Sequence, residues 1–176
     1  WTPVEAVKRA LEEAFYLACE HVEPANKRFM LVVDVSGSMA MSTIAGIPFV
    51  TPRAAAAVMA MVTARKEPQH HIMGFADKFM PLNISADMRL NEAIQAMNGL
   101  PFRGTDCALP MLHAMEHKIA VDTFVVLTDN ETWAGAVHPF QAIEQYRQAM
   151  GIPARLIVAG MTATNFTIAN PNDKGM

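Results

Sequence analysis

The sequence lacks an excess of positive charge. It has 14 Lys and Arg against 17 Asp and Glu, a net charge of −3 over 176 residues, and no block or stripe of basic side chains stands out. Such a chain carries no electrostatic footprint for nucleic acid. Aromatic residues are also scarce, at 7%, which argues against a surface on which single-stranded bases stack.

Two further absences narrow the class of protein. The chain has two cysteines, Cys19 and Cys107, too few for a disulfide framework, so we expect a reduced, cytoplasmic protein. No apolar run is long enough to cross a bilayer, and no membrane partner is expected. Apolar residues make up 52% and charged residues 18% of the chain, which is the composition of a globular domain.

The signatures of several enzyme classes are missing as well. Neither the nucleophile elbow G-x-S-x-G nor the phosphate-binding glycine motifs occur. The best enzymatic alternative is a Mg²⁺-dependent phosphatase with Asp34 as nucleophile, because an aspartate follows a first strand there too. That chemistry calls for a second carboxylate two residues later, where this chain has Ser36. We therefore expect a binding domain and not an enzyme.

Strands and helices are predicted to alternate along the chain. Strands are predicted at 29–33, 70–75, 122–128 and 154–159, each with a run of consecutive apolar residues rather than an alternating pattern, as expected of strands that are buried on both faces. Helical patterns lie between them. The fold class is therefore α/β, with a doubly wound, mostly parallel central sheet and helices on both faces. A short edge strand is expected at 81–85.

Cap signals predict where the helices begin and end. A leading helix is expected within residues 1–24, with Thr2 as its N-cap and Glu5 completing a capping box. Thr51 and Pro52 begin a second helix that ends before Pro68. Asp87 is expected to cap another, and Asp106 is interpreted as an N-cap rather than a metal ligand. The helix from Pro139 should end at Gly151.

A cluster of oxygen donors follows the first predicted strand. Asp34, Ser36 and Ser38 form a D-x-S-x-S motif, which offers one carboxylate and two hydroxyls. Hard oxygen donors of this kind favour Mg²⁺, Mn²⁺ or Ca²⁺ over Zn²⁺. The alternative is that Ser-Gly-Ser is simply a turn after a strand.

Two later loops carry matching donors. Thr105 lies in a loop that enters a helix, and Asp129 follows the strand that ends near Leu127. Because the carboxyl ends of parallel strands share one edge of a sheet, these loops can converge on one crevice. The predicted metal ligands are Asp34, Ser36, Ser38, Thr105 and Asp129. With so few charged ligands, the cation should seek a carboxylate from a partner. Asn130 and Glu131 are expected in a solvated part of the same loop.

Histidines offer a weaker alternative site. His113 and His117 are spaced i, i+4 on a predicted helix, as zinc ligands can be. The order His-Ala-Met-Glu-His is not the zincin pattern, and no third ligand lies nearby in the sequence. Zinc is therefore not expected.

The five predicted ligands resemble the metal-ion-dependent adhesion site of von Willebrand factor A-type domains. In that family the D-x-S-x-S motif, a threonine in a later loop and an aspartate after the next central strand coordinate one divalent cation. The order and spacing of the motifs fit, and the resemblance covers nearly all of residues 1–176, which we interpret as one such domain. It implies one cation, Mg²⁺ above Mn²⁺ or Ca²⁺, and a carboxylate-bearing ligand. A second alternative is a generic von Willebrand A module for protein–protein adhesion.

Further motifs are similar to the Ro (TROVE) ribonucleoprotein family. They are Glu23-Pro24, Lys27-Arg28, Asp34-Val-Ser-Gly-Ser, Gly104-Thr-Asp-Cys, Thr128-Asp-Asn-Glu-Thr, His138-Pro139, Ile152-Pro-Ala-Arg-Leu-Ile-Val and Gly160-Met161-Thr162. The resemblance implies part of a protein that binds small noncoding Y RNAs and misfolded RNAs in RNA quality control. In that family a ring of helical repeats binds the RNA. The ring is absent from this chain, so no residue here inherits RNA binding.

Overall fold

The fold is built on a five-stranded sheet. The computed structural model describes residues 2–76, 78–98, 104–129, 134–162 and 167–176. The strand order is β3-β2-β1-β4-β5, and every neighbouring pair is parallel except β2 with β3. The strands are β1 Phe29–Asp34, β2 His70–Phe75, β3 Phe79–Pro81, β4 Thr123–Thr128 and β5 Arg155–Gly160.

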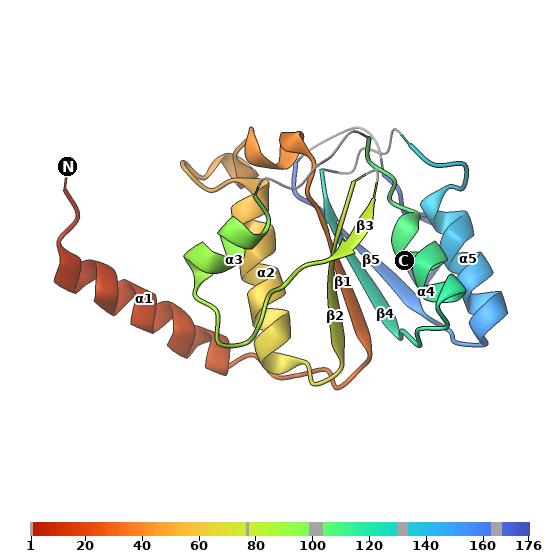
Figure 1. Ribbon diagram of the computed structural model, residues 1–176, viewed down its shortest axis with the longest axis horizontal. Helices are drawn as coiled ribbons and strands as arrows, with labels where there is room; N and C mark the ends of the chain where they lie inside the picture. Colours follow the sequence, from red (N-terminus) through yellow and green to blue (C-terminus); the bar gives the residue numbers. More distant parts are fainter. Residues whose placement is uncertain (1, 77, 99–103, 130–133, 163–166) are drawn as a thin grey trace.

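Helices cover both faces of this sheet. The helices α2 (Pro52–Lys66) and α3 (Leu90–Ala96) pack on one face, and α4 (Leu109–Glu116) and α5 (Pro139–Met150) pack on the other (Figure 1). The predicted doubly wound, mostly parallel α/β fold is confirmed. β1 shows why its residues are apolar without alternation: both faces of the strand are buried. Met30 and Val32 pack in the core on the α4 and α5 side, and Leu31 and Val33 pack in the core on the α2 side.

Two of the predicted helix ends are confirmed. Thr51 is the N-cap of α2, and its hydroxyl accepts a 3.2 Å hydrogen bond from the Ala54 amide, with Pro52 at the first helical position. Helix α5 ends at Gly151, whose φ of +64° lies in the left-handed region. That conformation is easy for glycine and strained for other residues.

Three predicted N-caps are wrong. Helix α1 spans Glu5–Glu20, within the expected 1–24, but its N-cap is Val4, so Thr2 does not cap it. Arg89 and Ala108 occupy the N-cap positions of α3 and α4 in place of Asp87 and Asp106. Short polar residues also favour turns just before a helix, which is what these aspartates do. Asp87 accepts a hydrogen bond from Ser85, and Asp106 accepts one from the Ala108 amide.

Two further elements differ from the prediction. The edge strand β3 lies at Phe79–Pro81 rather than 81–85. Helix α1 lies apart from the layers around the sheet (Figure 1), and its apolar Val7, Leu11 and Leu17 are more than half exposed. Glu12 ties it to α3 through a 2.8 Å ion pair with Arg89. Among the residues described, no helix is long and apolar enough to span a membrane.

Candidate metal centre

The predicted ligands lie at the carboxyl ends of three adjacent strands. Asp34 ends β1, which lies between β2 and β4 in the sheet. Asp129 directly follows β4. The loop of Thr105 adjoins the loop after β2, because the Asp106 amide donates a 3.0 Å hydrogen bond to the Ala76 carbonyl. The topology therefore brings all three loops to one edge of the sheet, as Figure 1 shows for the strand ends.

Asp34 is fully buried and held by two hydrogen bonds. Its Oδ1 accepts from the Ser36 amide at 2.8 Å, and its Oδ2 accepts from the Thr128 hydroxyl at 2.9 Å. Each carboxylate oxygen can accept a further bond. Burial raises the pKa of Asp34, the bonds from Ser36 and Thr128 lower it, and the charge of Asp129 raises it again. A nearby divalent cation would favour the charged form of this carboxyl.

The two serine hydroxyls are spaced as neighbouring ligands of a small cation. Ser36 Oγ and Ser38 Oγ lie 3.0 Å apart. Octahedral Mg²⁺ with bonds of 2.0–2.1 Å holds adjacent oxygens about 2.9 Å apart. A short 3₁₀ helix, Gly37–Ala40, turns the chain here, and its Met39 is fully buried and anchors the turn. Ser38 is exposed, so the pair faces solvent on one side.

Thr105 and Asp129 are both buried, each with 7% of its surface exposed. The Thr105 carbonyl accepts a 3.1 Å hydrogen bond from the Ala134 amide, which ties its loop to the loop that follows Asp129. At Gly104 a Cβ would lie 3.2 Å from the Cβ of Ala134, so a glycine allows the loops to approach. Asp34, Ser36 and Ser38 therefore form a contiguous cluster. Asp129 interacts electrostatically with Asp34, and the loop of Thr105 is bonded to Ala76 and Ala134.

Arg53 is a supporting residue that the sequence reasoning missed. Its Nη2 donates to the carbonyls of Val35 and Ser36 at 3.3 and 3.1 Å, and its Nη1 donates to Asn98 at 3.0 Å. It thereby fixes the backbone of the D-x-S-x-S motif. Burial lowers the pKa of Arg53, and attraction to Asp34 raises it. The sequence did contain a sign of this role. Arg53 lies in the first turn of α2, where its positive charge is unfavourable to the helix dipole, so its presence there indicates a function other than stabilising the helix.

The donor set suits a hard cation. All five side chains offer oxygen, and in the described part of the chain no group of three or more His, Cys, Asp or Glu gathers as a metal site. The rings of His113 and His117 stack on each other at 4.1 Å. Carboxylate and hydroxyl oxygens are the ligands of Mg²⁺ and Ca²⁺ rather than of softer metals. Asn130 and Glu131 lie outside the described residues.

Comparisons with known proteins bear on the family of the chain. The model of the Ro60 vWA domain family matches residues 28–176, so α1 precedes the match. The chain is 52% identical to the RNA-binding protein RO60 of Deinococcus radiodurans over 176 residues, and 40% identical to that of Caenorhabditis elegans over 177 residues. Both alignments include the whole of this chain, but they span only 33% and 27% of the length of the two relatives.

Solved structures give the same result for the fold. The crystal structure of the Deinococcus radiodurans RO (RSR) protein matches with a TM-score of 0.92, over 100% of this chain and 36% of that one, at 52% identity. An aerotolerance-related membrane protein from Bacteroides fragilis matches with a TM-score of 0.54 and 17% identity, over 84% of this chain and 74% of that one. The second likeness concerns the fold alone.

Proposed function

The chain belongs to the Ro60 vWA domain family, and on this premise we propose that it is a divalent-cation-dependent ligand-binding domain of a Ro-type protein. The observation that carries the proposal is the arrangement of Asp34, Ser36 and Ser38. A buried, doubly hydrogen-bonded carboxylate lies directly beside two hydroxyls that are 3.0 Å apart. A structural turn needs neither the buried charge nor the Arg53 guanidinium that holds the backbone behind it.

The proposed roles follow from the chemistry of each side chain. Ser36, Ser38 and Thr105 supply neutral hydroxyls to the cation, and Asp34 and Asp129 supply negative charge directly or through water. Mg²⁺ is the first choice, with Mn²⁺ and Ca²⁺ as alternatives. A cation held mostly by neutral oxygens stays Lewis-acidic, and its preferred further ligand is a carboxylate from another protein or a small acid.

RNA binding belongs to the longer protein in this proposal. The two relatives are named RNA-binding proteins, and this chain spans a third or less of each. With its net charge of −3, the domain itself would repel a phosphate backbone. We propose that noncoding RNA, including Y RNA and misfolded RNA, contacts other parts of the full-length protein. The absence of catalysis and the cytoplasmic location stay predictions.

Calorimetric titration of Mg²⁺ and Mn²⁺ into the chain tests the proposal. Wild-type protein should bind one cation, and Asp34→Ala should bind at least tenfold more weakly. Ser42→Ala, which removes a hydroxyl just outside the motif, is the matched control and should bind as wild type does. Equal affinity of Asp34→Ala and wild type would sink the site assignment. Mg²⁺-dependent hydrolysis of a generic phosphomonoester, abolished by Asp34→Ala, would favour the phosphatase alternative instead.

A further inference from the structure

An uncharged loop with exposed apolar side chains follows the candidate metal residues directly. Residues 35–52 contain no Asp, Glu, Lys, Arg or His. Within this stretch Phe49 is 98%, Met41 88% and Ile47 51% exposed. Single exposed apolar residues are ordinary. Three of them on one short loop beside a binding site are typical of an interaction surface.

The loop is held in a defined shape. The Ile44 amide donates a 2.9 Å hydrogen bond to the Val50 carbonyl, and the Ile47 amide donates one of 2.9 Å to Ile44. The Ile44 side chain packs against the core on the α2 side. At the end of the loop Thr51 caps α2. The exposed side chains are therefore presented by a framework that is already ordered, which lowers the entropic cost of binding a partner.

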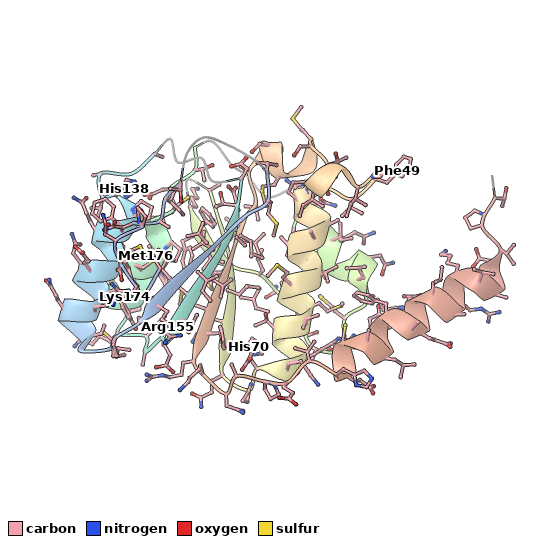
Figure 2. All side chains as sticks on the ribbon, turned by 180° about the vertical axis from the view of Figure 1, so that it is seen from behind. Phe49, His70, His138, Arg155, Lys174 and Met176 are labelled. Atoms are coloured by element: carbon pink, nitrogen blue, oxygen red, sulfur yellow. The ribbon has the colours of Figure 1, made fainter. Side chains whose placement is uncertain are left out.

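Phe49 has a backbone conformation that does not suit an aromatic residue. Its φ of +67° lies in the left-handed region, where a side chain with a Cβ is strained. Strain of this kind gathers at binding sites, where the surrounding structure sustains it. Figure 2 shows Phe49 pointing outward at the end of the molecule where the strands have their carboxyl ends, opposite His70 at the start of β2.

We propose that residues 41–49 and the candidate metal site form one docking surface for a protein segment in which an Asp or Glu stands next to a large apolar residue. The carboxylate of that segment completes the coordination of the cation, and its apolar neighbour packs on Phe49 and Met41. This proposal rests on the function proposed above and adds the chemistry of the partner.

The charges around the loop favour a protein over RNA. RNA affinity depends on Lys and Arg contacts to phosphates, and residues 35–52 supply none. The next basic residue, Arg53, has both Nη atoms engaged by carbonyl oxygens of Val35, Ser36 and the Asn98 side chain. A phenyl ring that is almost fully exposed is instead the kind of side chain that is enriched in protein–protein interfaces.

The experiment selects peptides from a random heptapeptide library displayed on phage, against the immobilised chain in Mg²⁺. The enriched peptides should pair Asp or Glu with a neighbouring Phe, Leu, Met or Trp. The most enriched peptide is then synthesised, and its binding is measured by fluorescence anisotropy. Phe49→Ser should weaken binding at least tenfold. Leu11→Ser, which removes an exposed apolar residue on α1, should leave it unchanged, and EDTA should abolish it.

Each other outcome overturns the inference and says which part fails. If acidic peptides bind Phe49→Ser and wild type equally tightly, the cation function is retained but the docking surface is excluded. Peptides that bind equally in EDTA would remove the cation from the contact, and Mg²⁺ calorimetry on the same protein would show whether the metal site itself fails. The absence of any enriched motif counts against the surface. So does self-association, or binding of a single-stranded RNA, that Phe49→Ser abolishes.

Discussion

The hydroxyl of Thr128 donates a 2.9 Å hydrogen bond to Oδ2 of Asp34, and neither side chain is exposed to solvent. The bond joins the carboxyl ends of β4 and β1. It orients a carboxylate in a place where burial raises the pKa of that group. Without a cation, the buried negative charge of Asp34 lowers the stability of the fold. With a cation bound, the same charge attracts the cation. Stability and binding therefore respond in opposite directions when the charge is removed.

Asp34→Asn should weaken Mg²⁺ binding at least tenfold and yet raise the free energy of unfolding of the metal-free protein at pH 7 by roughly 1 kcal/mol. The amide keeps the volume and accepts from the Ser36 amide, and the Thr128 hydroxyl can turn to accept from the new NH₂ group. Because the folded-state pKa of Asp34 is raised, the stability of metal-free wild type relative to the variant is greatest at acid pH and falls as pH rises. Urea titrations with EDTA measure this difference.

Thr128→Val is the companion variant. It keeps the charge and removes the donor, so the metal-free protein should lose about 1–3 kcal/mol because a buried carboxylate oxygen loses its partner. A stability loss in Asp34→Asn as large as that in Thr128→Val would contradict this account of the site.

Arg53 should act as a positioning residue for the motif. Arg53→Lys keeps the charge but cannot bond the Val35 and Ser36 carbonyls and Asn98 together, because an ammonium lacks the planar fork. We expect a Mg²⁺ affinity about tenfold lower, with the metal-free protein destabilised by about 1–2 kcal/mol. Arg65→Lys, on the same helix, is the control, and its Mg²⁺ affinity should equal that of wild type. Calorimetry measures both variants, and unchanged binding in Arg53→Lys would exclude the role.

The sequence predicted the sheet well because its strands are buried on both faces. The apolar runs around Leu31 and Val125 have one physical reading, as parallel central strands, and the structure has them there. Helix starts were predicted less well. Thr51 caps α2 as expected, but Asp87 and Asp106 serve turns and each lies three residues before the first residue of its helix. Local sequence does not distinguish a turn from a cap when both use the same hydrogen bond.

The candidate site shows the same division. Asp34, Ser36 and Ser38 are neighbours in sequence, so their clustering follows from one turn. Thr128 was predicted at the end of a strand, but its bond to Asp34 depends on β4 lying beside β1. The contact of Arg53 depends on how α2 packs at the end of the sheet. No local sequence pattern predicts the Thr128–Asp34 bond or the contact of Arg53, because each joins residues that are far apart in the sequence.

The Asp122 carboxylate should make stability depend on acid pH. Arg28 donates to it from its side chain and its backbone amide, and the hydrogen bonds and charge of Arg28 lower the pKa of Asp122 to about 2. Because the folded-state pKa lies below the ordinary value, the stabilisation is complete above about pH 4 and disappears as pH falls toward 2.

Asp122→Asn should therefore cost about 1–2 kcal/mol at pH 7, an amount reduced by solvent screening of the partly exposed pair. The difference between wild type and variant should shrink toward zero near pH 2. Urea unfolding at several pH values measures it, with Glu144→Gln, an exposed carboxylate on α5, as the control. A gap that stays constant from pH 6 to pH 2 would exclude the ion pair as its source.

RNA binding by this chain alone should be weak. A net charge of −3 opposes the phosphate contacts that dominate affinity for nucleic acid. In a gel shift at physiological salt we expect no complex with a structured RNA at low micromolar protein. Tight binding whose affinity falls steeply with added salt would instead reveal a basic patch assembled by the fold. Lys66, Lys78, Arg103 and Arg155 would then be the residues to replace first.

Phe49 offers a test of whether its strained backbone serves binding. If residue 49 contributed to stability alone, a residue that tolerates φ near +67° would be better there. Phe49→Asn should raise the free energy of unfolding by about 0.5–1 kcal/mol, because Asn adopts the left-handed region with less strain and the exposed phenyl contributes little burial. Lys118→Gly, at a second left-handed position just after α4, should gain a similar amount by the same cause.

The two variants separate stability from function. Both should raise the melting temperature, and both should keep the Mg²⁺ affinity of wild type. Phe49→Asn alone should lose the acidic, apolar peptides described above, since it removes the aromatic anchor, whereas Lys118→Gly lies far along the chain from the loop. If Phe49→Asn is less stable than wild type, the phenyl group packs against the rest of the protein in solution and is not exposed for a partner. If it is more stable and binds the peptides normally, the strain serves no docking function.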